Sequence, residues 1–297
     1  MTERYWGSVR FYKHLYIMCF TTLVILPLAC IFYFISVSDA ATKPTGMTNG
    51  DEPYEMESAS VKRSVDLSIY RKKYPELYGR TAEKENFPDY TVYLTFDDGP
   101  SPVTEQVLDV LKKYQVRATF FVVGERLNDV TGKNTLRRIL REGHSLGSHS
   151  NTHNYRKIYA SVEAWLDDFA IVNRKISDIT GQKTTIFRFP GGSINVYNSP
   201  IYQELIAEMT RRGYVYFDWN VSAGDISLVP PSAQTLYANV VNRSFNGNRI
   251  VILLHDSAGK AETVKALPRI IEYYRQKGLS FDRLQNHTYP ITFGYRS

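Results

Sequence analysis

An α/β fold with a parallel sheet is predicted for residues 90–297, and two observations predict it. From Tyr90 onward, short β-rich runs alternate with longer amphipathic stretches, which is the pattern of strands connected by helices. The 297-residue chain is 43% hydrophobic and 22% charged, which is enough for a large core and too apolar for a disordered protein. About seven strands alternate with helices, so the sheet is either open and doubly wound or closed into a barrel.

The expected elements follow one another in regular order. Strand-like runs, rich in β-branched and aromatic residues, occupy residues 91–96, 118–123, 145–148, 185–189, 215–219, 249–254 and 279–284. Amphipathic stretches of helical length lie between them, at residues 102–114, 134–143, 161–181, 200–213, 232–245 and 261–278. A helix therefore separates nearly every pair of consecutive strands, as connections between parallel strands require.

Residues 15–37 form an apolar stretch without a single charge. At about 1.5 Å per residue, a helix of this length covers a hydrocarbon core of about 30 Å, so a transmembrane signal-anchor helix is predicted. The alternative is a cleaved signal peptide, because the small residues Ser38 and Ala40 follow the stretch. Secretory apolar regions usually span only about 7–15 residues, which favours the anchor.

The charges on either side of this helix predict its orientation. Basic residues including Arg10 and Lys13 precede it, so the positive-inside rule places residues 1–14 in the cytoplasm. Residues 38–89 are polar and lack a sustained apolar pattern, which predicts a flexible extracytoplasmic linker, with a short helix near Leu67 to Leu77 as the alternative for its last part. We therefore expect a single-pass protein of the cell membrane whose folded domain, residues 90–297, lies outside.

Net charge and cysteine content limit the partners. The chain has 36 Lys and Arg against 30 Asp and Glu, and a net charge of +6 is too mild to indicate a nucleic-acid partner. Both cysteines, Cys19 and Cys30, lie in the apolar stretch, so the domain contains neither a disulfide nor a thiolate metal site. Any metal there must be bound by His and carboxylates.

Polar residues lie where the predicted strands end, at the edge where α/β folds place their active sites. In chain order they are Asp97, Asp98, His149, His153, Arg188, Asp225 and His255. Carboxylates that close an apolar strand need a stabilising partner, and a divalent cation with a nearby Arg supplies one. A simple turn is the alternative for the Asp-Asp-Gly-Pro segment, whose residues are typical of turns.

Two histidines have the spacing of metal ligands. His149 and His153 are four residues apart, which would place both imidazoles on one face of a helical turn. Together with one Asp they make a set for a first-row divalent metal, expected to be Zn²⁺, with Co²⁺ or Mn²⁺ as alternatives. A structural role is the other interpretation of the pair. His144 has no partner at a strand end and is interpreted as a packed or surface histidine.

The motifs TFDDGP, HSNTH, RFPGG, WNVSAGD and LLH, in this order, resemble the five motifs of the polysaccharide deacetylase family, also called the NodB homology domain or carbohydrate esterase family 4. The resemblance covers Tyr90 to Leu284 and implies a distorted (β/α)7 barrel. The roles it implies are general base for Asp97, metal ligands for Asp98, His149 and His153, partner of the base for Arg188, partner of the acid for Asp225 and general acid for His255.

The third motif departs from the family pattern. Gly191 and Gly192 follow Pro190 where the family often has an aromatic residue, so a looser loop around the oxyanion is expected. All three residues are expected to contact substrate.

The fourth motif also departs. Ile226 follows Asp225 where the family usually has Trp, so Trp219 is the candidate replacement unless that Trp is absent. Asp218, beside Trp219, is a rival partner for the acid that ranks below Asp225. Leu253 is expected to form part of the pocket for the acetyl methyl group.

These residues predict a hydrolase of carbon-nitrogen bonds, a metal-dependent N-deacetylase of a cell-surface glycan. Peptidoglycan is the expected substrate, because the domain is expected outside the membrane on a linker long enough to reach the wall. Alternatives are a chitin or poly-N-acetylglucosamine deacetylase, an O-acetyl esterase and a non-catalytic glycan-binding module. A glycosidase also uses two carboxylates but would not need the histidine pair.

Overall fold

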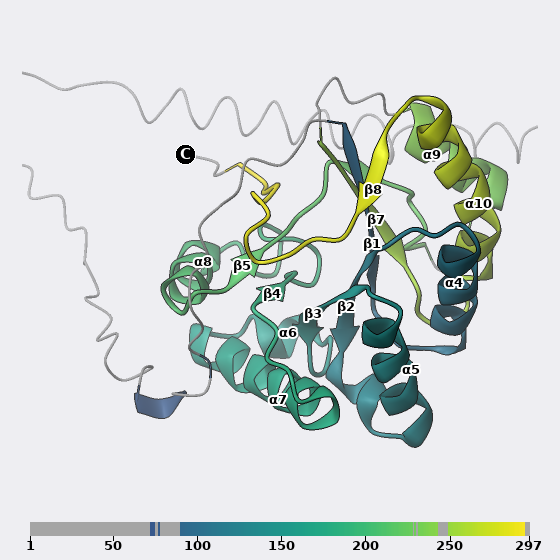
Figure 1. Cartoon of the computed structure of the whole chain (residues 1–297). Helices are drawn as coiled ribbons and strands as arrows, with labels where there is room; N and C mark the ends of the chain where they lie inside the picture. The colour runs from purple at the N-terminus through teal and green to yellow at the C-terminus, as the bar shows by residue number, and fades with distance from the viewer. Residues whose placement is uncertain are drawn as a thin grey trace, which may run out of the picture. The chain divides into compact units, whose positions relative to one another are not determined.

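The structure is a computed structural model that describes residues 72–74, 77, 90–227, 229, 231–242 and 249–294. Its parallel strands form one curled sheet with the order β5-β4-β3-β2-β1-β7-β6, and β8 pairs with the beginning of β1 (Figure 1). The strands are β1 Thr91–Asp97, β2 Thr119–Val123, β3 Ser145–Ser150, β4 Ile186–Phe187, β5 Val215–Tyr216, β6 Val221–Ser222, β7 Arg249–His255 and β8 Ser280–Asp282. Because β5 and β6 end the path without pairing in the described residues, the sheet is a curled half-barrel.

Helices cover the outer face of this sheet (Figure 1). They are α4 Pro102–Lys113, the 3₁₀ turn η3 Gly124–Leu127, α5 Val130–Arg141, α6 Tyr155–Ile158, α7 Val162–Thr180, α8 Tyr202–Arg211, α9 Ala233–Asn242 and α10 Ala261–Gln276. The longer ones contact one another in the series α9, α10, α4, α5, α7 and α8, which follows the order of the strands beneath them. This is the arrangement that a β/α alternation predicts.

Side-chain alternation along β1 separates two cores. Val92, Leu94 and Phe96 point outward and pack with the helices in the larger core. Tyr93 points inward and packs in a smaller core inside the curl. Because side chains alternate along a strand, Asp97 shares the inner face with Tyr93. The polar end of β1 therefore lies on the concave side of the sheet.

The sequence predicted the α/β class and every long helix, and it missed the shortest elements. β6 was not expected, since two residues are too few to show a period-2 pattern. The expected strands at 185–189 and 215–219 shrink to the two-residue strands β4 and β5. After β5 the chain leaves the sheet, and the backbone carbonyls of Phe217 and Asp218 accept hydrogen bonds from the Arg188 side chain.

Two residues of the expected linker pack against the domain. Tyr74 and Leu77 are 4% and 0% exposed and belong to the larger core. The Tyr74 hydroxyl donates to Asp167 at 2.7 Å, and the Tyr74 carbonyl accepts from Arg212 at 3.0 Å. Two apolar residues in a polar segment make no periodic pattern, so sequence analysis could not detect this anchoring.

The remaining N-terminal expectations fall on other residues. Within the part of the chain that the structure describes, no helix has the length and apolarity needed to cross a membrane. The expected membrane helix at residues 15–37 lies outside the described residues.

Trp165→Ala should destabilise the fold strongly. Trp165 is fully buried in α7. Its ring stacks on that of Phe169 at a centroid distance of 5.4 Å, and its ring centroid lies 4.9 Å from that of Phe189. The cavity should lower the free energy of unfolding by about 3–5 kcal/mol, measured by urea denaturation. Ile171→Ala is the matched control in the same helix, because Ile171 is 41% exposed, and it should change stability by about 0.5 kcal/mol or less. Equal losses would contradict this description of the core.

Candidate active site

The expected base and acid lie side by side at the ends of two neighbouring strands. Asp97 ends β1 and His255 ends β7, and the two residues are partners in the parallel register. Neighbouring strands are about 4.8 Å apart, so both side chains leave the sheet at one point. His149 lies near the end of β3, and Arg188 directly follows β4. The carboxyl ends of four strands thus supply one site.

Arg188 holds the Asp97 carboxylate in a single position. The Arg188 side chain is fully buried, and its Nη1 donates to Asp97 Oδ1 at 2.9 Å and to Thr95 Oγ1 at 2.8 Å. Its Nε and Nη2 donate to the carbonyls of Phe217 and Asp218 at 2.8 and 3.0 Å. A guanidinium that is held by several hydrogen bonds can orient a carboxylate. Arg188 contacts only Oδ1 of Asp97, so Oδ2 is free of this contact.

Asp98, His149 and His153 form a three-residue cluster that could bind a metal. Their ligand atoms all lie within 4.8 Å of one another. Asp98 Oδ1 lies 3.0 Å from His153 Nε2 and 3.5 Å from His149 Nε2. Asp98 Oδ1 is also buried and has no hydrogen-bond partner among the described residues. Two nitrogens that converge on one unsatisfied carboxylate oxygen are the donor set of a divalent cation.

The tautomer of His149 suits this use. His149 Nδ1 lies 2.9 Å from the Arg188 carbonyl oxygen, to which it can only donate. The lone pair is then on Nε2, which faces Asp98. Burial lowers the pKa of His149, which favours the neutral imidazole that binds metals. The residues present therefore fit a divalent metal.

The two histidines do not share a helical turn, so that expectation is wrong. His149 belongs to strand β3, and His153 lies in the following turn with a φ of 54°. The turn is held by Asp168 of α7, whose carboxylate accepts from the backbone N–H groups of Asn151 and Thr152. This tertiary contact brings the His149 and His153 rings to a centroid distance of 5.2 Å.

His255 and Asp225 form a buried pair. His255 Nδ1 lies 2.8 Å from Asp225 Oδ1, and Asp225 Oδ2 accepts from the His255 N–H and from Thr263 Oγ1, both at 2.8 Å. Burial lowers the pKa of His255, but the hydrogen bond and charge of Asp225 outweigh it and, with Asp97 and Asp98, raise the pKa to about 9. The imidazole is therefore protonated at neutral pH.

Asp218, the rival partner, does not contact His255. Its carboxylate accepts from the backbone N–H and hydroxyl of Ser193 and from the backbone N–H of Phe293. Asp218 therefore fastens the loop after β4 to the C-terminal segment.

The loop after Pro190 is tightly packed, in contrast to the looser loop that was expected. Gly191 and Gly192 both have positive φ angles, 77° and 86°. A Cβ on Gly191 would lie 2.8 Å from the Tyr155 ring, and one on Gly192 would lie 2.5 Å from the Phe293 ring. Rings from elsewhere in the chain take up the space of the missing side chains. The Pro190 carbonyl accepts from the buried Tyr159 hydroxyl at 2.7 Å.

The other two expected substrate residues are Trp219 and Leu253. Trp219 is half-buried, and its ring centroid is 5.5 Å from the Arg188 guanidinium carbon. Ile226 is 66% exposed, so it does not replace a buried Trp. Leu253 precedes His255 by two residues on β7 and shares its face of the sheet.

Sequence analysis missed Asp256, which organises the loop containing Asp98. Asp256 is 1% exposed; its carboxylate accepts from Thr104 Oγ1 at 2.6 Å, and its carbonyl accepts from Ser101 Oγ at 2.6 Å. It packs so closely on Gly99 that a Cβ there would lie 2.4 Å from Asp256 Oδ2. Burial raises the pKa of Asp256 to about 7. The signal in the sequence was an Asp directly after the end of strand β7.

Asp225→Asn should lower the pKa of His255. The amide removes the negative charge that outweighs burial, so the pKa should fall from about 9 to or below the ordinary value of about 6.5. NMR titration of the His255 ring in metal-free protein would measure it. Asp218→Asn is the control and should leave the His255 titration unchanged, since Asp218 contacts Ser193 instead. An unchanged His255 pKa in Asp225→Asn would contradict the pairing.

Comparisons with known proteins agree with this geometry. The family profile for polysaccharide deacetylases matches residues 84–210. The putative polysaccharide deacetylase YheN of Bacillus subtilis is 35% identical over 272 residues, which cover 90% of each chain. A peptidoglycan-N-acetylglucosamine deacetylase of Bacillus cereus is 29% identical over 206 residues, 68% of this chain and 72% of that one.

Among solved structures, the catalytic domain of a peptidoglycan N-acetylglucosamine deacetylase from Eubacterium rectale is 36% identical, with a TM-score of 0.67. The match covers 73% of this chain and 98% of that one. A relative at 35% identity over nine-tenths of both chains, together with the strand-end site, shows that this chain belongs to the polysaccharide deacetylase family.

Proposed function

We propose that this protein is a metal-dependent deacetylase that removes N-acetyl groups from the N-acetylglucosamine of peptidoglycan. The observation that carries the proposal is the pairing of Asp97 with His255 in register beside the Asp98, His149 and His153 cluster. The relatives described as peptidoglycan-N-acetylglucosamine deacetylases support this choice of glycan.

Amide hydrolysis needs three contributions, and the site has a candidate for each. Water must be activated, the oxyanion must be stabilised, and the departing amine must be protonated. A divalent cation held by the three-residue cluster would supply Lewis-acid chemistry, which lowers the pKa of water and polarises a carbonyl. We assign Zn²⁺ as that cation, with Co²⁺ or Mn²⁺ as alternatives, because the donors are two imidazoles and one carboxylate.

The side chains of the chain itself move the protons. Asp97 takes a proton from the attacking water on Oδ2, because Oδ1 is engaged by Arg188. His255 gives a proton from Nε2 to the amine nitrogen, because its Nδ1 is engaged by Asp225. The carbon-nitrogen bond breaks, and the products are acetate and a free amine on the sugar.

The loop after β4 is suited to the oxyanion and the acyl group. The Gly192 N–H donates to the Phe189 carbonyl at 2.8 Å, whereas the Gly191 N–H makes no hydrogen bond within the described residues. We assign the Gly191 N–H to the oxyanion and Leu253 to the acetyl methyl group. A Cβ on Gly192 would lie 3.2 Å from the Trp219 ring, so we assign Trp219, together with Pro190, to the sugar.

The protein is proposed to act from the outer side of the cell membrane. The apolar stretch at residues 15–37 would anchor it, with residues 1–14 in the cytoplasm and the domain outside. The linker then ends before Tyr74, because this residue and Leu77 pack against the catalytic domain. An extracytoplasmic anchor would place the site within reach of the wall polymer.

Substituting Asp97 and Asp98 one at a time should show which of them is the base and which is the metal ligand. Asp97→Asn should keep the bound metal and lose activity by about 10²–10⁴-fold, as expected when a positioned base is removed. Asp98→Asn should lose metal first, because one of three protein ligands becomes a weaker donor. Metal content by mass spectrometry and acetate release are measured on the same preparations. The opposite ranking of metal loss would reverse the two assignments.

Cells lacking the protein should have a more acetylated peptidoglycan and greater sensitivity to lysozyme. Deacetylation leaves amines that are largely protonated at neutral pH and removes acetamides that a muramidase cleft binds. Both a wild-type copy and a His255→Ala copy should be recovered in the membrane fraction. Only the wild-type copy should restore resistance to lysozyme. Restoration by His255→Ala would show that the protein acts by binding, and wild-type protein in the soluble fraction would refute the anchor.

A further inference from the structure

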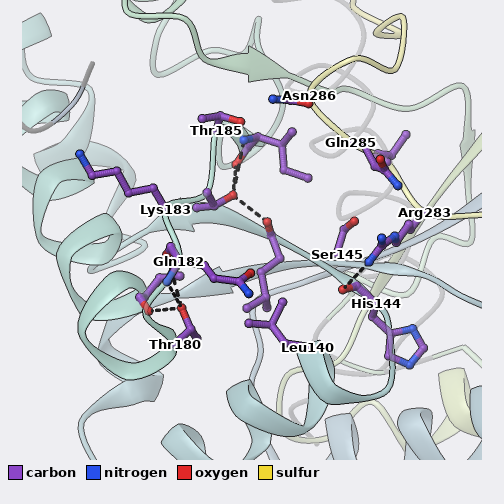
Figure 2. Close-up of a pocket in the computed structure, with 15 residues that line it drawn as sticks. Leu140, His144, Ser145, Thr180, Gln182, Lys183, Thr185, Arg283, Gln285 and Asn286 are labelled. Atoms are coloured by element: carbon purple, nitrogen blue, oxygen red, sulfur yellow. Dashed lines mark hydrogen bonds between the residues drawn. The ribbon is translucent and has the colours of Figure 1, made fainter. Parts of the chain in front are cut away.

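A cavity of about 300 Å³, drawn in Figure 2, is lined by residues near the beginnings of two strands. Ser145, which begins β3, and Thr185, which precedes β4, line it. The other ends of these strands carry His149 and Arg188. At about 3.3 Å per residue, Ser145 and His149 are separated by about 13 Å along β3. The cavity is therefore separate from the catalytic cluster, and its volume reaches the range of small-molecule sites, about 300–1,000 Å³.

The charged side chains that line this cavity are positive. Among the described residues, the lining contains Arg283 and Lys183 but no Asp or Glu. Arg283 Nη1 donates to the carbonyl of Gly143 at 2.9 Å and to that of His144 at 3.4 Å, which fixes the guanidinium in place. Figure 2 shows the contact with His144. Arg283 Nε is buried and has no hydrogen-bond partner in the described part of the chain. Among the described residues no carboxylate forms an ion pair with this guanidinium, so its positive charge is left for an anion in the cavity.

Neutral polar groups surround this guanidinium. The amides of Gln182 and Gln285 and the hydroxyls of Ser145 and Thr185 line the cavity. Among the described residues these four side chains make no hydrogen bond, so they are available to a ligand. Apolar side chains, including that of Leu140, form the rest of the wall. Amides and hydroxyls beside an apolar surface suit a small polyhydroxylated ring.

We propose that this cavity is a second binding site, which holds a small acidic sugar through its carboxylate or phosphate oxygens with Arg283 as the principal donor. Arginine presents a planar set of N–H donors that matches such oxyanions, and no carboxylate among the described lining residues competes for it. Occupation would bring the anion against the Arg283 guanidinium and engage the free amides of Gln182 and Gln285. The site would hold an acidic part of a glycan while catalysis takes place at the other end of the sheet.

NMR titration of the full chain tests this proposal on the Arg283 Nε–H signal. The probes are N-acetylmuramic acid, N-acetylglucosamine 1-phosphate and the neutral N-acetylglucosamine. At least one acid should shift the signal saturably, at millimolar concentration, and the acid that binds more tightly identifies carboxylate or phosphate as the source. The neutral sugar should leave the signal in place. Absence of a saturable shift with both acids, or an equal shift with the neutral sugar, would overturn the proposal.

Substitutions locate the binding. Arg283→Lys should weaken binding of the acid about tenfold, because the ammonium loses the planar donor set. Gln285→Ala removes a side chain that makes no hydrogen bond to the described residues, so the fold should persist while binding weakens several-fold. Acetate release from a small soluble substrate should stay unchanged. Amide shifts of Ser145 and Thr185 report on binding in both variants.

Arg117→Gln is the matched control. Arg117 is an exposed arginine that is paired with Asp282 at 3.5 Å and does not line the cavity. Binding should be unchanged in this variant, and also in His255→Ala, whose deacetylase site is inactive. Equal weakening in Arg117→Gln and Arg283→Lys would mean diffuse charge attraction and would overturn the proposal. Loss of binding in His255→Ala would assign the signal to the catalytic site and would also overturn it.

Discussion

The buried ion pair of Arg188 and Asp97 is the constraint on which the site depends. A carboxylate with 3% exposure and a guanidinium with none are stable only when both are paired and hydrogen-bonded. Arg188 meets this condition through Asp97 and Thr95 of β1 and through the carbonyls of Phe217 and Asp218 beyond β5. Removing one partner of such a pair lowers the free energy of unfolding by about 3–5 kcal/mol. The folded state therefore keeps Asp97 against Arg188, and this contact sets the position of the Asp97 carboxylate.

Contacts that spread from this pair order the rest of the site. The Arg188 carbonyl fixes the tautomer of His149, which turns Nε2 toward Asp98. The Asp218 backbone accepts from Arg188 while its carboxylate holds Ser193, so one residue links the base to the loop after Pro190. The register of β1 and β7 then places His255 beside Asp97. This placement comes from the backbone pairing and needs no contact between the two side chains.

Much of this site could be predicted from the sequence because parallel strands carry their carboxyl ends to one edge. Asp97, Arg188 and His255 each close or follow an apolar run, and the fold brings such positions together. The pairing of Asp225 with His255 rested on the family resemblance alone. It could not be derived from spacing, since the two residues are 30 positions apart.

What sequence analysis missed depends on contacts between distant segments. The turn that brings His153 to His149 is held by Asp168, which lies in the next long helix. Tyr155 and Phe293 fill the space at Gly191 and Gly192, and neither ring could be assigned there from the motif. The cavity at the opposite end of the sheet is assembled from three separate segments, so no local pattern indicates it.

Product analysis with the purified full chain tests the central claim most directly. The account predicts that digestion of peptidoglycan releases acetate and free amino groups in equal amounts, creates no new reducing ends, and ceases after treatment with a chelator. Chitin oligomers and acetylxylan, digested in parallel, should release less acetate. New reducing ends without acetate, or full acetate release after exhaustive chelation, would contradict the account.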